Sequence, residues 1–173
     1  MPEKETLERA RADKRAGKAP STQAGEFVRE EMHHIREGKH GARSTKQAIA
    51  IGLSKARRSG VHLPAPPASA KATTKRSAKS AARAGAHPRR RTSTRRSRAT
   101  RAALKREGRR AASHKSLARQ AKTAASRRSP AQRRAAARRA SRTKGPRVRK
   151  AAARKAARTR QQHATGRRRR ASA

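Results

Sequence analysis

Large apolar side chains lie mostly in the first 63 residues of the chain, where they recur with helical spacing. Positions three and four apart share one face of a helix, so the spacing predicts helices over residues 22–37 and 45–58. The apolar face of the first carries Ala24, Phe27, Val28, Met32 and Ile35. The face of the second carries Ala48, Ile49, Gly52, Leu53 and Ala56. Together the two faces predict a helical hairpin.

Start and stop signals bound both helices. Ser21 or Thr22 is a candidate N-cap of the first helix, and Gly38 is a natural stop. Ser44, followed three residues later by Gln47, gives the second helix a capping-box pattern. The local signals therefore agree with the apolar period.

Two positions on the apolar faces make specific predictions. Gly52 lies in a stripe of small residues spaced four apart, so we expect another backbone to approach it closely. Glu31 falls inside the apolar arc of the first helix, so it must lie at the edge of that arc or pair with a basic side chain.

A leading helix is predicted over residues 3–16, with Glu3 and Glu5 in its first turn. Only Leu7 and Ala10 give it an apolar face, so weak docking is expected. The sequence thus predicts a small all-α head over residues 1–63, of marginal stability alone and able to self-associate.

The residues after position 63 have a different composition. Residues 64–82 are rich in Pro, Ala and Ser, which is typical of a linker, and residues 83–173 are a low-complexity tail of Arg, Ala, Ser and Lys. The few large apolar side chains in it cannot offset the entropy of ordering it. The expected fold class is therefore a mostly disordered chain with a small all-α N-terminal unit.

The tail nevertheless carries helix signals. Ser129 and Gln132 form a capping-box pattern around Pro130, and Gly145-Pro146 precedes a second Arg/Ala-rich run. We expect these segments to become helical on binding a polyanion, which relieves the repulsion between their charges.

Charge is unevenly placed along the chain. The formal net charge is +43, and residues 1–63 hold 14 basic and 8 acidic side chains, a net of +6. Residues 64–173 hold 38 basic side chains and one acidic side chain, a net of +37. An excess of this size indicates a polyanionic partner, nucleic acid in particular.

Arg outnumbers Lys by 29 to 9 in residues 64–173, and none of these residues is aromatic. Arg binds phosphate through two-point contacts, and base stacking on aromatic side chains is unavailable in the tail, which argues against a dedicated single-strand reader. Binding is therefore expected to be largely independent of sequence, with DNA preferred and RNA as the alternative. The candidate nucleic-acid-binding residues are Lys39, Arg43, Lys46, Arg89, Arg90, Arg91, Arg95, Arg96, Arg133, Arg134, Arg138, Arg139, Arg154, Arg158, Arg167, Arg168, Arg169 and Arg170.

The loop GKHGARSTK, residues 38–46, has two interpretations. Its basic residues surround the N-terminus of a capped helix, where free N–H groups favour an anion. Its spacing differs from that of a nucleotide-binding P-loop. The alternative is an ordinary polar connector whose glycines end one helix and turn the chain.

Other chemistry is not indicated. The chain has no Cys, and His33, His34 and His40 lack a recognised metal-binding spacing, so solvated histidines and no metal or cofactor are expected. No nucleophile, base and acid can be assembled, so we expect no enzyme. No apolar run could span a membrane or act as a secretory signal, and a cytoplasmic location at the nucleoid is expected.

The stretch STQAGEFVREEMHHIREGKHGARSTKQAIAIGLSKARRSGV, residues 21–61, resembles an uncharacterised family of small basic bacterial proteins, known only as a numbered domain of unknown function. The resemblance includes MPEKETLERARADKRAGKAP and covers residues 1–65. It implies no activity and no site residues. The tail resembles, in composition, the tails of linker histones and bacterial histone-like proteins, although Arg replaces much of the Lys of linker histones.

These observations favour a non-enzymatic, histone-like protein that neutralises DNA and condenses or bridges it through an Arg-rich tail. An RNA- or ribosome-associated protein is the alternative, since rRNA is an equally dense polyanion. A third possibility is an adaptor whose helical head binds a protein partner.

Overall fold

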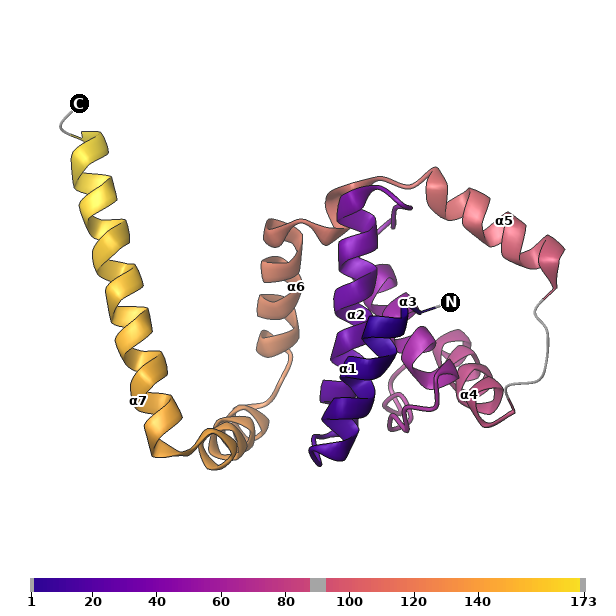
Figure 1. The fold of residues 1–173 in the computed structure, drawn as a ribbon, viewed down its shortest axis with the longest axis horizontal. Coiled ribbons are helices and arrows are strands. Elements are labelled where there is room, and N and C mark those ends of the chain that lie inside the picture. The colour runs from indigo at the N-terminus through magenta and orange to yellow at the C-terminus, as the bar shows by residue number, and fades with distance from the viewer. Residues whose placement is uncertain (1, 88–92, 172–173) are drawn as a thin grey trace. The chain divides into compact units, whose positions relative to one another are not determined.

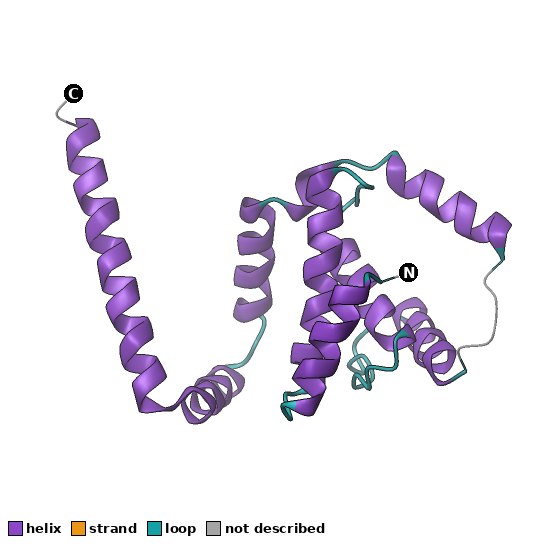
Figure 2. Ribbon diagram, in the orientation of Figure 1, coloured by secondary structure: helices purple, strands orange, loops and turns teal. Residues whose placement is uncertain are grey.

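The computed structural model describes residues 2–87 and 93–171, and these residues are mostly helical (Figure 1). Figure 2 shows helices joined by loops, with no strand among the described residues. The helices are α1 (Lys4–Arg15), α2 (Pro20–Glu37), α3 (Thr45–Arg58), α4 (Ala72–Ala86), α5 (Thr94–Lys105), the 3-10 helix η1 (Arg109–Ala112), α6 (His114–Ser126) and α7 (Pro130–Ala171). None of the described helices is both long enough and apolar enough to cross a membrane.

The expected fold class, a mostly disordered chain with a small all-α N-terminal unit, is therefore wrong. Helix α4 begins inside the segment expected to be a linker, and α5, η1, α6 and α7 occupy most of the expected disordered tail. Low apolar content limits the size of a core, but it does not prevent helix formation. Ala, Arg and Lys are strong helix formers, and the tail consists largely of them.

The chain forms two compact units. The first ends at Ala121 and the second begins at Lys122, so the boundary lies within α6 and far beyond residue 63. The first unit contains α1 to α5 and η1, and the second contains α7.

Helices α2 and α3 form the predicted hairpin, and its apolar faces pack in two clusters. Met32, Ile35 and Ala48 lie in one cluster, and Phe27 and Ala56 lie in the other, all buried. The helices cross closely at Gly52, where an added Cβ would lie 2.7 Å from Val28 Cα. The predicted close approach is confirmed, and it accounts for a glycine inside a helix.

Helix α1 packs against α2 through the two apolar residues that the sequence indicated and through polar contacts. Ala10 is buried in the cluster that holds Phe27, and Leu7 packs against that cluster. Arg9 Nε also donates a hydrogen bond to Glu26 Oε2 at 2.9 Å. The polar contacts between the two helices thus supplement a narrow apolar contact.

Helix α2 begins earlier than its predicted N-cap. Pro20 occupies the first turn, Ala19 is the N-cap residue, and neither Ser21 nor Thr22 caps the helix. Proline needs no hydrogen-bond partner for its nitrogen and has a helical φ, so it starts a helix without a side-chain cap.

Segments after residue 63 complete the first unit. Helix α4 packs against α3, and its Ala81 is 1% exposed. Ala111 and Ala112 of η1 are buried in the cluster that holds Ile35, and Leu117 of α6 packs against them. Small alanine side chains allow these segments to approach closely, which a count of large apolar residues does not detect.

The second unit consists mainly of α7, whose N-terminus has the predicted capping box. Ser129 Oγ accepts a hydrogen bond from Gln132 N at 3.2 Å, and Gln132 Oε1 accepts one from Ser129 N at 3.2 Å. At Gly145 the φ angle is 61°, so α7 is two helical segments joined at the predicted Gly145-Pro146 break.

Candidate nucleic-acid interface and a buried ion-pair network

The basic side chains of α5 and α7 are displayed to solvent. Every described Lys and Arg side chain from Lys122 onward is exposed, and residues 122–173 contain 20 Lys and Arg and no Asp or Glu. The predicted site residues Arg95, Arg96, Arg133, Arg134, Arg138, Arg139, Arg154 and Arg158 are all exposed. Exposure without acidic neighbours leaves α7 as a dense cationic surface.

The helical geometry arranges part of this charge in rows. Before Gly145, a first row of cations consists of Arg134, Arg138 and Arg142, which are four residues apart. A second row lies after Gly145. The second row consists of Lys150, Arg154 and Arg158. Residues four apart lie about 6 Å apart along a helix axis, so each row presents regularly spaced cations on one face.

Some of the predicted tail residues lie outside the described part of the chain. Arg89, Arg90 and Arg91 are outside the described residues, and so are the side chains of Arg167, Arg168, Arg169 and Arg170. The described candidate residues therefore form two separate cationic surfaces, one on α5 in the first unit and one on α7 in the second.

The three basic candidates in the loop between α2 and α3 differ in their surroundings. Lys39 Nζ lies 3.2 Å from Glu3 Oε1 and 3.1 Å from Glu37 Oε2, so its charge is already paired. Arg43 and Lys46 are exposed and have no carboxylate partner among the described residues. The structure thus leaves two of the three available to an external anion.

The N-terminus of α3 is capped as the sequence predicted. Ser44 Oγ accepts a hydrogen bond from Gln47 N at 3.2 Å, and Gln47 Oε1 accepts one from Arg43 N at 2.9 Å. Thr45 Oγ1 donates to the Ala111 carbonyl at 2.7 Å, so η1 covers one side of this helix end. These contacts favour the connector interpretation of the loop.

Behind the loop lies a network of ion pairs that is mostly shielded from solvent. Lys55 Nζ lies 3.1 Å from Glu30 Oε1 and 2.7 Å from Glu31 Oε2, and the Glu30 and Glu31 side chains are 1% and 0% exposed. The prediction that Glu31 pairs with a basic side chain is confirmed. Burial of the Lys55 ammonium opposes its charge, but the adjacent Glu31 and Glu30 carboxylates outweigh burial and raise the pKa of Lys55.

Two histidines lie beside this pair, which corrects the expectation that all the histidines are solvated. The side chains of His34 and His40 are 12% and 16% exposed, whereas His33 is 70% exposed. His34 Nε2 lies 2.8 Å from Glu3 Oε1, and His40 Nε2 lies 3.3 Å from Glu31 Oε1. The hydrogen bonds from His34 and Lys39 lower the pKa of Glu3 to about 2.

Sequence reasoning considered His34 and His40 but missed their meeting with Glu31, because it looked for known metal-binding spacings along the sequence. His40 follows Gly38, which ends α2 with a φ of 81°, a left-handed conformation that reverses the chain. The reversal returns His40 to the side of α2 that carries Glu31. In the sequence, Gly38 at the end of α2 was the one signal that the chain reverses before His40.

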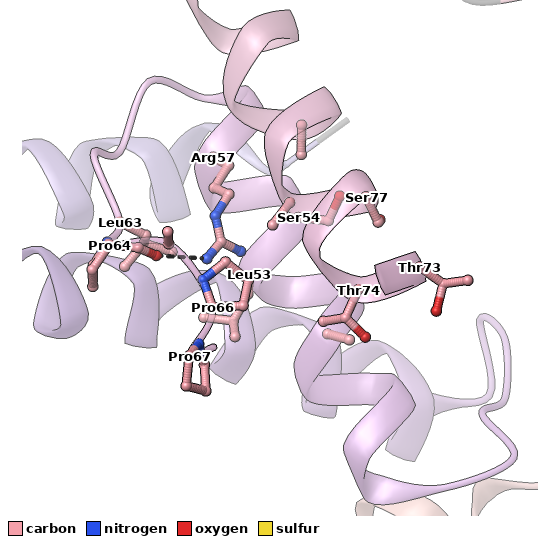
Figure 3. Close-up of a pocket in the computed structure, with 14 residues that line it drawn as sticks. Leu53, Ser54, Arg57, Leu63, Pro64, Pro66, Pro67, Thr73, Thr74 and Ser77 are labelled. Carbon is pink, nitrogen blue, oxygen red and sulfur yellow. Dashed lines mark hydrogen bonds between the residues drawn. The ribbon is translucent and has the colours of Figure 1, made fainter. Parts of the chain in front are cut away.

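A separate cavity of about 580 Å³ lies between α3, α4 and the segment that joins them (Figure 3). Leu53, Leu63 and Pro66 supply much of its lining, and Arg57 Nη2 donates to the Pro64 carbonyl at 3.2 Å across one side. Most of the lining surface is apolar, although Ser54, Arg57, Thr73, Thr74 and Ser77 also line the cavity, so it suits apolar contact better than catalysis.

No curated protein and no solved structure matches the chain. One family does match part of it, from Asp13 near the end of α1 to Pro66 beyond α3. The matched range contains the hairpin, the loop between α2 and α3, and most of the ion-pair network, whereas the cationic surface of α5 and α7 lies outside it. Residues 13–66 thus match a family of unknown function (DUF6496).

Proposed function

We propose that this chain is a non-enzymatic, largely sequence-independent DNA-binding protein of the bacterial nucleoid. In this proposal the Arg-rich helices after residue 93 neutralise phosphate charge and condense or bridge duplexes, as histone-like proteins do. The small helical head carries them and provides a surface for self-association.

The observation that carries this proposal is the composition of residues 122–173, with 20 basic side chains, no acidic ones, and every described Lys and Arg side chain exposed. Like charges four residues apart on a helix each cost about 0.2–0.5 kcal/mol, and phosphates remove that cost. Duplex DNA carries one charge per 1.7 Å of axis, so twenty phosphates occupy about 34 Å.

The absence of aromatic residues after Phe27 supports binding to the backbone rather than to bases. Proteins that bind single strands stack the bases on aromatic side chains, and reading of base edges requires a recognition element held in a groove. Phosphate contact alone gives affinity that depends little on sequence and steeply on salt.

The decisive experiment compares two variants of the full chain in fluorescence-anisotropy titrations with duplex DNA over a range of salt. The first replaces Arg147, Lys150, Arg154 and Arg158 of α7 with Gln. The second removes the same charge from α1 by replacing Lys4, Arg11, Lys14 and Arg15 with Gln. All eight side chains are exposed.

The α7 variant is expected to bind more weakly and to lower the slope of log K against log salt by up to about 3.6, since each lost phosphate contact contributes about 0.9. The α1 variant is expected to change the slope by much less. Equal losses in the two variants would contradict the proposal, because they would reflect net charge rather than a surface on α7.

RNA is the main competing ligand. Crosslinking in cells followed by nuclease footprinting separates the two, because reads dominated by rRNA would replace the DNA proposal with an RNA- or ribosome-associated one. The adaptor role of the head stays a prediction, and a pull-down with residues 1–121, the first compact unit, would test it.

A further inference from the structure

The Glu31 carboxylate is buried without the hydrogen bonds that such a group requires. Its side chain is 0% exposed, and Oε1 has no hydrogen-bond partner in the described structure, whereas Oε2 is satisfied only by its ion pair with Lys55. Lys55 lies 2.7 Å from Oε2, which leaves Oε1 facing His40 alone. An unsatisfied buried carboxylate oxygen is costly, so its surroundings indicate a missing partner.

The ring of His40 does not supply that partner in its neutral form. Nδ1 lies 3.1 Å from the Gly41 carbonyl, which can only accept, so Nδ1 carries the ring proton. Nε2 then presents a lone pair to Glu31 Oε1 at 3.3 Å. Two acceptors that face each other need a cation between them, either a proton or a metal ion.

His34 is held in a matching way. Its Nε2 lies 2.8 Å from Glu3 Oε1, and a carboxylate accepts from the ring, so Nδ1 carries the lone pair and lies 4.0 Å from Glu30 Oε1. Histidine ligands of metal ions usually donate their other ring N–H to a carboxylate or a backbone carbonyl, which fixes the tautomer. Glu3 does this for His34, and the Gly41 carbonyl does it for His40.

The three side chains lie close enough to share one ion. One ligand atom from each of Glu31, His34 and His40 lies within 4.8 Å of the others. Ligands at about 2.0–2.1 Å from a tetrahedral zinc ion lie roughly 3.3 Å apart, which matches the Glu31–His40 separation.

The charge of the surrounding network also favours a divalent cation. The ion pairs of this network join four carboxylates and two ammonium groups, a net of −2 with neutral histidines, in a chain whose overall charge is +43. The carboxylates are Glu3, Glu30, Glu31 and Glu37, and the ammonium groups are Lys39 and Lys55. One divalent ion would balance this charge.

We propose that Glu31, His34 and His40 bind a divalent transition-metal ion such as Zn²⁺, with Glu3, the Gly41 carbonyl and Lys55 orienting the three ligands. Nitrogen and oxygen donors of this kind suit zinc, and water would fill the remaining coordination position. The ion would join α2 to the loop after Gly38 and so stabilise the first compact unit. This site is independent of the proposed DNA binding.

The test uses the untagged full chain, freed of metal with EDTA and kept in a phosphate-free buffer at pH 7.5. Zn²⁺ is titrated by calorimetry, and X-ray absorption at the zinc edge identifies the ligands. The site variant replaces His34 and His40 with Gln. The control variant replaces His33 and His62, both exposed, with Gln, and so removes the same number of imidazoles.

The unaltered chain and the control are expected to bind one Zn²⁺ at least ten-fold more tightly than the site variant, with two imidazoles and oxygen donors in the absorption spectrum. Zinc is also expected to raise the melting temperature of the unaltered chain but not that of the site variant. The inference fails if the control loses as much affinity as the site variant, or if the unaltered chain binds no stoichiometric zinc. A Glu31→Gln variant that folds yet keeps full affinity would also refute it.

Discussion

Glu31 is buried by its position on α2 and depends on a cation from α3. Its position in the apolar arc of α2 places a carboxylate in the interior, and Lys55 of α3 makes this possible by lying 2.7 Å from Oε2. A buried ion pair adds little net stability compared with apolar residues, but loss of one partner leaves an uncompensated charge. The pair therefore ties the register of α3 to that of α2.

Replacement of Lys55 with Met tests this coupling. The change leaves Glu30 and Glu31 buried without their cation, so the free energy of unfolding of the first unit is expected to fall by about 3–5 kcal/mol. Urea denaturation followed by circular dichroism measures it. Lys46→Met, at an exposed position of the same helix, is the control and should change stability by less than about 0.5 kcal/mol. A similar small effect at Lys55 would contradict the coupling.

At the scale of elements, small residues rather than large apolar ones determine how the helices meet. The crossing of α2 and α3 depends on the absence of a side chain at Gly52, and α4 and η1 are held through buried alanines. When two backbones approach closely, many of their atoms come within van der Waals contact, and the dispersion attraction between the helices increases. This is how a chain with few large apolar residues builds a first unit of 121 residues.

The crossing can be tested by Gly52→Ala. Although Ala favours a helix by about 0.5–1 kcal/mol, its Cβ would lie 2.7 Å from Val28 Cα, so a net loss of about 1–3 kcal/mol is expected. Gly25→Ala is the matched control, because an added Cβ there meets nothing within 4 Å. It should stabilise the unit. Stabilisation by both substitutions in thermal melts would show that the helices do not cross closely.

Docking of α4 is tested with Ala81→Asp. Ala81 is 1% exposed, so a carboxylate there would be buried without a partner and is expected to release α4 from α3. Hydrogen exchange should then show loss of protection in residues 72–86. Ala82→Asp, one position along at an exposed site, should leave protection unchanged. Equal exchange in both variants would mean that α4 does not pack through Ala81.

At the scale of the whole molecule, the two kinds of charge are separated along the chain. Eight of the nine acidic residues lie before residue 64, where most of them pair with Arg, Lys or His side chains, and residues 64–173 contain one acidic residue against 38 basic ones. The acidic residues are thus used for folding of the first unit. The unpaired cations provide the long-range field that would attract a polyanion.

Duplex DNA is therefore expected to stabilise α7 more than the hairpin. Binding to a folded segment shifts its opening equilibrium, and phosphates also relieve the repulsion within each row of cations. Hydrogen exchange of the full chain with and without DNA should show increased protection over residues 130–164 and little change over residues 20–58. Increased protection confined to the hairpin would place the DNA-binding surface on the head.

The sequence by itself determined the helices of the hairpin, the caps at Ser44 and Ser129, the break at Gly145 and the separation of charge. These features follow from the period of apolar positions and from interactions between residues a few positions apart, which a sequence displays directly. It also implied that Glu31 needs a basic partner, without naming Lys55. The helical state of the tail was missed because apolar content was weighed above helix propensity.

Only the tertiary structure decided which distant segments meet. The packing of α4 and η1 through Ala81 and Ala112, and the meeting of His40 with Glu31, depend on the path of the backbone after Gly38 and on close contact between small side chains. Alanine has the same local preferences whether it is buried or exposed. Burial therefore depends on the shapes of surfaces that come together only when the chain folds.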